Sequence, residues 1–185
     1  MTPTAPVLYF AYGSNMQTAT FSGRRGIPFR RARPARATGW RLVLDKPPLV
    51  SIGEGFASIV PDTAAIVIGV VYEITAADLE HVDLTEGVLI DNYRRVQIPV
   101  TPLDAPEEVL HVHTLTSERR DPSLLPSDRY MGLIVAGAEE HGLPADWIAF
   151  LRTIPTRPES AESKRFRPVL DDVMRRRRDD DSDER

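Results

Sequence analysis

The sequence contains no cysteine. Disulfide frameworks, thiolate nucleophiles and zinc–thiolate sites are therefore excluded. No apolar run approaches the roughly 18–20 residues needed to span a bilayer. The N-terminal MTPTAPVLYF has no basic region before its short apolar stretch, so it does not look like a signal peptide. We therefore expect a soluble, cytoplasmic protein with no membrane partner.

The standard nucleotide and hydrolase motifs are also missing. GxGxxG and GxxxxGK[ST] do not occur, and Ser14 lies in neither GxSxG nor SxxK. The net charge of -4 gives no electrostatic case for nucleic acid as the main partner. His111 and His113 would share one face of a strand, but no third metal ligand is evident nearby, so an exposed strand face is the preferred interpretation. We expect no metal and no cofactor.

Strand patterns dominate the first part of the chain. Runs of apolar, β-branched or alternating residues predict strands over residues 7–10, 40–44, 56–60, 64–74, 93–100 and 109–115. Pro61-Asp62 is expected to end the third strand. Gly69, inside the fourth, indicates a bulge or a close approach of two backbones. The basic stretch from Thr18 to Pro34 is expected to be irregular.

Helix signals follow. Thr75 and Asp78 have capping-box spacing and Gly87 can end that helix. A longer helix is predicted to open at Pro126-Ser127-Asp128 and to end at Gly142, and a further one starts at Pro144. The fold class is therefore α+β: a strongly curved mixed sheet or small barrel with flanking helices.

The composition changes after residue 155. Residues 1–155 are expected to form one domain, a size that allows one core. Residues 156–185 are expected to form a polar extension with a short helix over Pro168–Met174. The charged tail RRRRDDDSDER has no apolar residue and is expected to be disordered.

The stretch YFAYGSNM places small, polar residues directly after the first strand. Gly13 lets a ligand approach the backbone. Successive N–H groups at Gly13, Ser14 and Asn15 can form a nest for a carboxylate or an oxyanion. The alternative is a plain turn.

Glu86, in DLTEGV, is the second candidate. At a helix C-terminus the negative end of the dipole disfavours an ionised carboxylate, and partial burial acts in the same direction. A carboxyl group whose pKa is raised in this way can accept a proton and then return it near neutral pH. The alternative is a solvated surface glutamate. Tyr93 and Tyr130 can either direct their hydroxyls into a site or serve as ordinary core residues.

Several segments, in order, resemble the gamma-glutamylcyclotransferase superfamily, which includes gamma-glutamylamine cyclotransferases, BtrG and AIG2-like proteins. The resemblance extends over about residues 7–154. It rests on LYFAYGSNM, ARATGWRLVLD, GFASIVPD, IGVVYEIT, DLTEGV with the following Tyr93, and PSDRYMGLIVAGAEEHGLPADWIAFL.

The resemblance implies a small mixed β-barrel with flanking helices. It also implies release of 5-oxoproline and an amino acid or amine from a γ-glutamyl compound, without metal or cofactor. Glu86 would be the catalytic acid/base. The substrate-binding residues would be Tyr9, Phe10, Ala11, Tyr12, Gly13, Ser14, Asn15, Tyr93 and Tyr130.

Alternatives remain open at this stage. The substrate can be a γ-glutamylamine or a biosynthetic γ-glutamyl compound, or the fold can bind a small ligand without turnover. The arginines between Arg24 and Arg36 can favour an anionic leaving portion or can simply be solvated. A nucleic-acid-binding role for Arg24–Arg41 and Arg175–Arg178 is disfavoured by the acidic total and the DDD after RRRR. The protein is expected to be a monomer or a homodimer.

Overall fold

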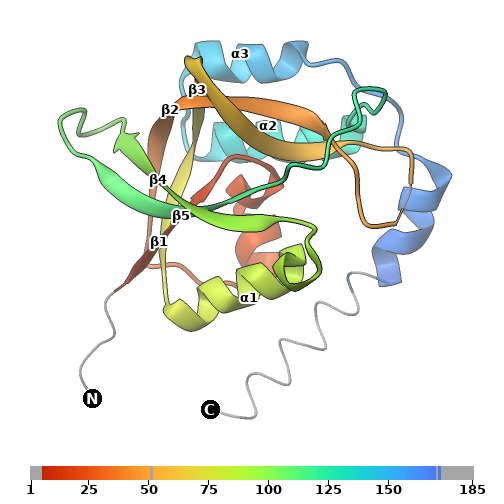
Figure 1. Cartoon of the computed structure of the whole chain (residues 1–185), viewed down its shortest axis with the longest axis horizontal. Helices are drawn as coiled ribbons and strands as arrows, with labels where there is room; N and C mark the ends of the chain where they lie inside the picture. Colours follow the sequence, from red (N-terminus) through yellow and green to blue (C-terminus); the bar gives the residue numbers. More distant parts are fainter. Residues whose placement is uncertain (1–5, 51, 170, 172–185) are drawn as a thin grey trace.

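Five strands close into a barrel in the order β1-β3-β2-β4-β5 (Figure 1). The structure, a computed structural model, describes residues 6–50, 52–169 and 171. Neighbouring strands are antiparallel except β1 and β5, which pair in parallel where Tyr9 meets His113. The predicted small mixed barrel is confirmed. The strands are β1 Val7–Ala11, β2 Arg31–Lys46, β3 Phe56–Ile74, β4 Arg94–Pro102 and β5 Leu110–Thr116.

The hairpin of β2 and β3 is longer than the sequence pattern predicted. The strands expected over 56–60 and 64–74 are one continuous strand, so the prediction that Pro61-Asp62 ends a strand was wrong. Pro61 faces Trp40 beside a shift in register, next to Gly39 with φ 84°. An irregularity of this kind tolerates a residue without an N–H group, so the strand continues. β2 also extends into the basic stretch that was expected to be irregular.

Three α-helices flank the barrel: α1 Ala76–Glu86, α2 Asp128–Glu140 and α3 Ala145–Thr153. The capping box predicted for α1 is present, because the side chains of Thr75 and Asp78 each accept a hydrogen bond from the other's backbone N–H. Gly87 ends α1 in the left-handed region with φ 74°. The Ser127 side chain caps α2. Figure 1 shows α1 below the barrel in this view and α3 above it.

Three shorter helical turns lie between these elements: η1 Ser14–Met16, the π-helical η2 Ala19–Arg24, and η3 Val88–Ile90. η1 follows β1 and packs against α2. Met16 is fully buried, and the Tyr72 hydroxyl donates to its carbonyl at 2.7 Å. A Cβ atom on Gly137 would lie 2.6 Å from the Gln17 nitrogen, so α2 lies directly against this loop. The loop after β1 is therefore held from both sides.

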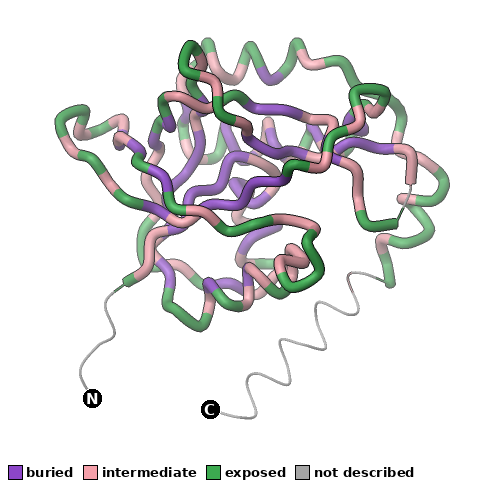
Figure 2. The backbone as a smooth tube through the Cα atoms, in the orientation of Figure 1, coloured by how far each residue is buried: buried purple, intermediate pink, exposed green. Residues whose placement is uncertain are grey.

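The core fills the barrel and the space under α2. Figure 2 shows buried backbone along the strands and exposed backbone along the outer helix α3. The largest fully buried side chains include Tyr72, Phe10, Phe21 and Met16. Phe21 stacks between Tyr9 and Tyr72, with ring centroids 5.7 and 4.5 Å away. This aromatic stack joins η2 to β1 and β3, which fixes η2 beside the end of β1.

Residues 156–169, called here the C-terminal extension, pack against the rest of the molecule. Arg157 donates its N–H to the Pro126 carbonyl at 3.0 Å and accepts from the Asp128 N–H at 2.8 Å. The buried Glu54 carboxylate accepts the Ser160 N–H at 2.7 Å, just before helical residues 161–169. This helix lies earlier than the predicted 168–174, most of which is outside the described residues, as is the charged tail. No helix among the described residues is long and apolar enough to cross a membrane.

Candidate active site

A cavity of about 410 Å³ opens between the end of β1, the end of α1, the start of α2 and the C-terminal extension. Most of the site residues predicted from the sequence lie around it. Those that line it are Tyr9, Tyr12, Gly13, Ser14, Asn15, Glu86, Tyr93 and Tyr130. The structure therefore brings YFAYGSNM and DLTEGV, far apart in the sequence, to one cavity.

Phe10 and Ala11 depart from the predicted substrate-binding set. Both are buried in the barrel, and neither lines the cavity. Phe10 faces the opposite side of β1 from Tyr9, since side chains alternate along a strand. The Ala11 carbonyl and the Phe10 ring lie against Gly69 of β3. The two residues therefore position the loop, and Tyr9 and Tyr12 reach the cavity.

Glu86 is the last residue of α1, and its side chain is 15% exposed. Its Oε1 accepts a hydrogen bond from Asn15 Nδ2 at 2.8 Å and pairs with Arg25 Nη2 at 2.8 Å. Asn92 Nδ2 donates to its main-chain carbonyl at 2.9 Å. The sequence led us to expect an environment that favours a neutral carboxyl group. The structure instead places a positive charge, Arg25, and a hydrogen-bond donor, Asn15, against this carboxyl group.

Arg25 is the main residue of the cavity that the sequence did not single out. Its side chain is 11% exposed, and its Nη1 donates to Thr85 Oγ1 at 2.9 Å, so it contacts the last two residues of α1. It directly follows η2, within the basic stretch that was expected to be irregular. The cluster of arginines was visible in the sequence, but only the packing of η2 shows which one faces inward.

Four tyrosines line the cavity together with Glu86. Tyr9 accepts from Asn15 Nδ2 at 3.3 Å, and Tyr12 donates to the Leu115 carbonyl. Tyr93 donates to the Ala57 carbonyl at 2.9 Å, and Tyr130 accepts from the Ala57 N–H at 3.2 Å. Burial raises the pKa of Tyr9, Tyr12 and Tyr93 well above the usual value and that of Tyr130 to about 12. These hydroxyls are therefore neutral near pH 7.

The loop after β1 continues directly into a short helical turn. Met16 N–H bonds to the Gly13 carbonyl at 3.0 Å, which starts the 3₁₀ turn η1. The N–H groups of Ser14 and Asn15 come before Met16, the first N–H that donates within the turn, so the turn itself does not satisfy them. A Cβ on Gly13 would lie 3.2 Å from the Ala57 Cβ and 3.4 Å from the Tyr130 hydroxyl. Glycine thus lets the loop lie close to Ala57 and Tyr130 without a tight contact.

Lys46, at the end of β2, is a buried cation in the cavity wall. Its Nζ lies 4.2 Å from the centroid of the Tyr93 ring and hydrogen-bonds Asn92 Oδ1. Arg119 Nη1 donates to the same oxygen at 3.2 Å. Burial, with a further contribution from Arg119, lowers the pKa of Lys46 to about 8. Sequence reasoning did not identify this residue.

We expect wild-type protein to gain stability relative to Lys46→Met as the pH is raised from about 7 to 10. Below pH 8 the lysine is charged in both states, and its burial penalty is fully present. Between its folded pKa of about 8 and its ordinary value of 10.5, the unfolded chain binds a proton that the folded chain does not. The free energy of unfolding therefore rises with pH. Urea denaturation at several pH values measures this, and a pH-independent difference between the two proteins contradicts it.

The histidines do not form a metal site with neighbouring ligands. His111 is exposed and His113 lies partly buried beside Gln97, with 3.2 Å between the two Nε2 atoms. Within residues 6–169 and 171, leaving out residue 51, no group of three or more histidine, cysteine, aspartate or glutamate side chains could hold a metal ion.

Comparison with known proteins agrees with this geometry. A sequence model of the AIG2-like family matches residues 66–151. Gamma-glutamyl cyclotransferase aclK of Aspergillus oryzae is 34% identical over 165 aligned residues, covering 79% of this chain and 60% of aclK. The gamma-glutamylcyclotransferase of Bos taurus is 29% identical over 150 residues, covering 80% of this chain and 78% of its own.

A solved structure named gamma-glutamyl cyclotransferase superposes with a TM-score of 0.72 and 24% identity, covering 92% of this chain and 99% of that chain. The protein thus has a small barrel of the AIG2-like type, whose cavity carries a glutamate at the end of α1. The chain is thus similar in sequence and in fold to gamma-glutamylcyclotransferases, as its motifs implied. It spans about 60% of the length of the fungal relative.

Proposed function

We propose that this protein releases 5-oxoproline from a γ-glutamyl compound. The observation that carries this proposal is the Glu86 carboxylate, which lies in the cavity with Asn15 and Arg25 each 2.8 Å from its Oε1. The names of the fungal and bovine relatives support the same reaction.

The reaction needs one group that acts first as a base and then as an acid. The substrate's α-amine is mostly protonated near neutral pH, so it must lose a proton before it can attack. Glu86 accepts that proton, and the amine nitrogen then forms a bond to the γ-carbonyl carbon, closing a five-membered ring. The bond from this carbon to the amide nitrogen breaks as protonated Glu86 returns the proton to the leaving nitrogen. The ring nitrogen gives up its second proton, and the released amine takes up one proton to become an ammonium group. Such general acid–base catalysis raises the reaction rate by about 10²- to 10⁴-fold.

The surroundings of Glu86 suit the first of these steps. Both Asn15 and Arg25 contact Oε1, so Oε2 is the oxygen assigned to the proton transfer. The ionised carboxylate is the form that accepts a proton, and Arg25 lies 2.8 Å from its Oε1. The N–H groups of Ser14 and Asn15 and the hydroxyl of Tyr130 supply neutral donors for the developing oxyanion or the substrate's α-carboxylate. Holding the substrate folded back on itself adds a proximity contribution.

We expect purified protein to release 5-oxoproline from at least one member of a substrate panel. The panel contains γ-glutamyl amino acids, γ-glutamyl amines and glutathione, and chromatography quantifies 5-oxoproline together with the released amine or amino acid. Equal amounts of the two products are expected. If calorimetry shows binding of γ-glutamyl compounds that are never cleaved, the protein is a non-catalytic binding module and the proposal fails.

A further inference from the structure

The cavity is positively charged, although the chain as a whole carries a net charge of -4. Among the described residues that line it, one side chain is acidic, Glu86, and five are basic: Arg24, Arg25, Lys46, Arg129 and Arg167. Arg25 pairs with Glu86. Arg24 pairs with Asp171, and Arg129 and Arg167 share Glu159, so five basic groups face three carboxylates. The surplus exceeds what one α-carboxylate of a γ-glutamyl group requires, so the cavity is suited to a ligand with more than one negative charge.

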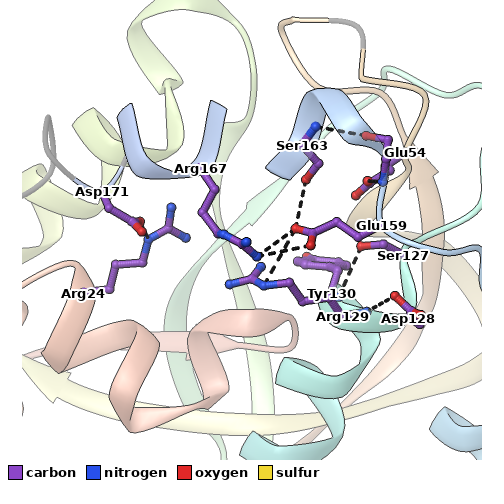
Figure 3. A network of polar contacts seen from close by, with 11 residues as sticks. Arg24, Glu54, Ser127, Asp128, Arg129, Tyr130, Glu159, Ser163, Arg167 and Asp171 are labelled. Carbon is purple, nitrogen blue, oxygen red and sulfur yellow. Dashed lines mark hydrogen bonds and ion pairs between the residues drawn. The ribbon is translucent and has the colours of Figure 1, made fainter. Parts of the chain in front are cut away.

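Two of these arginines meet at one carboxylate in the C-terminal extension (Figure 3). Arg167 Nη1 lies 2.9 and 3.2 Å from the two oxygens of Glu159, and Arg129 Nε lies 3.8 Å from Oε1. Ser163 Oγ donates to the same carboxylate at 3.3 Å. The Glu159 side chain is 9% exposed, whereas Arg167 and Arg129 are 33% and 39% exposed. One buried anion thus orients two guanidinium groups and leaves a net positive charge at the cavity wall.

The helical residues 161–169 are fixed to the body from both ends. Glu54 accepts the Ser160 N–H near the start of this helix, where the helix dipole favours an anion. Arg24, at the end of η2, pairs with Asp171, which is also helical and is the next described residue after this segment (Figure 3). The extension is therefore held across the cavity by charged contacts to two separate parts of the barrel.

The same region of the cavity has an apolar wall. Phe166 of the extension lines it together with Phe56 of β3, Leu133 of α2 and Leu49. An apolar surface beside a pair of guanidinium groups matches a ligand that combines a hydrocarbon side chain with a carboxylate. The guanidinium fork binds carboxylates with two donors in fixed geometry.

We propose that the C-terminal extension forms the leaving-group subsite, and that Arg167, with Arg129, selects a leaving amino acid that carries a carboxylate and an apolar side chain. This inference rests on the proposed function. The substrate's α-amine must reach Glu86, beside Asn15 and Tyr9, so the leaving portion extends into the part of the cavity lined by the extension. The AIG2-like match ends at residue 151, so Arg167 comes from a segment outside the matched region.

Two substrates that differ only by the carboxylate test this subsite. γ-Glutamyl-L-leucine carries it, and γ-glutamyl-isoamylamine has the same alkyl group without it. We expect Arg167→Gln to lower kcat/KM for the leucine compound by roughly 10- to 100-fold, the effect of losing a hydrogen bond between charged groups. The kcat/KM for the amine compound should change by less than about threefold. Arg167→Lys, which keeps the charge without the fork, should recover part of the loss.

Arg165→Gln is the matched control. Arg165 is exposed on the same helix and does not line the cavity. This variant therefore makes the same change in charge and should leave kcat/KM unchanged for both substrates. An equal loss for both substrates in Arg167→Gln, or no loss for the leucine compound, would overturn the subsite.

Calorimetry with γ-glutamyl-L-leucine separates this inference from the proposed function. If wild-type protein binds the compound without releasing 5-oxoproline, the proposed reaction fails. The subsite is then supported if Arg167→Gln weakens binding roughly 10- to 100-fold and Arg165→Gln does not. If wild-type protein neither binds nor cleaves the compound, the subsite is overturned.

Discussion

Glu86→Gln is expected to lower kcat for 5-oxoproline release by about 10²- to 10⁴-fold, the contribution of a lost general acid–base group. The substituted amide oxygen can still accept the hydrogen bond that Asn15 donates to Oε1. It cannot accept the amine proton or return it to the leaving nitrogen. Turnover with a saturating γ-glutamyl substrate, measured as 5-oxoproline formed with time, gives the size of the effect.

The fall in kcat must be separated from a loss of folded structure, because Glu86→Gln also removes the charge that pairs with Arg25. Glu80→Gln makes the same chemical change at an exposed position of α1 and should keep both activity and melting temperature. Circular dichroism and thermal unfolding compare the two variants. Near-native turnover by Glu86→Gln would remove this residue from the mechanism, whereas a large drop in melting temperature would assign it a structural role.

The parts of the fold that could be predicted from the sequence depend on local signals. The capping box of Thr75 and Asp78 and the glycine at position 87 set both ends of α1 within a dozen residues of one another. Ser127 and Gly142 do the same for α2. The continuity of β3 through Pro61 could not be predicted in this way. It depends on the register of β2, where Trp40 lies opposite Pro61 at an irregular position.

The same distinction applies to the site. Glu86, Tyr93 and the loop after β1 could be predicted because each belongs to a short motif. Arg25, Lys46 and Arg167 could not, because their place in the cavity depends on how η2, the end of β2 and the C-terminal extension pack against distant segments. A basic cluster in an acidic chain was visible, but it contains both the inward-facing Arg25 and arginines on the outer part of β2 that are exposed, such as Arg31 and Arg36.

Gly69→Ala is expected to lower the free energy of unfolding by about 3 kcal/mol or more, at the upper end of the cost of overpacking a core. A Cβ atom at this position would lie 2.2 Å from the Ala11 carbonyl oxygen and 2.9 Å from Phe10 Cζ. The carbonyl cannot rotate away without breaking the ladder of β1 and β3, in which Ala11 pairs with Val70. Urea denaturation measures the loss, which can be large enough to prevent folding.

Gly132→Ala supplies the comparison, since it adds the same methyl group where nothing lies within 4 Å of the new Cβ. In the middle of α2 this change should be neutral or stabilise the protein by up to about 1 kcal/mol. Equal stability of the two variants would contradict the close approach of β1 and β3 at Gly69. The displaced strand leads directly into Tyr12 and Gly13 of the cavity wall. Any Gly69→Ala protein that folds should therefore also lose activity per folded molecule, whereas Gly132→Ala should not.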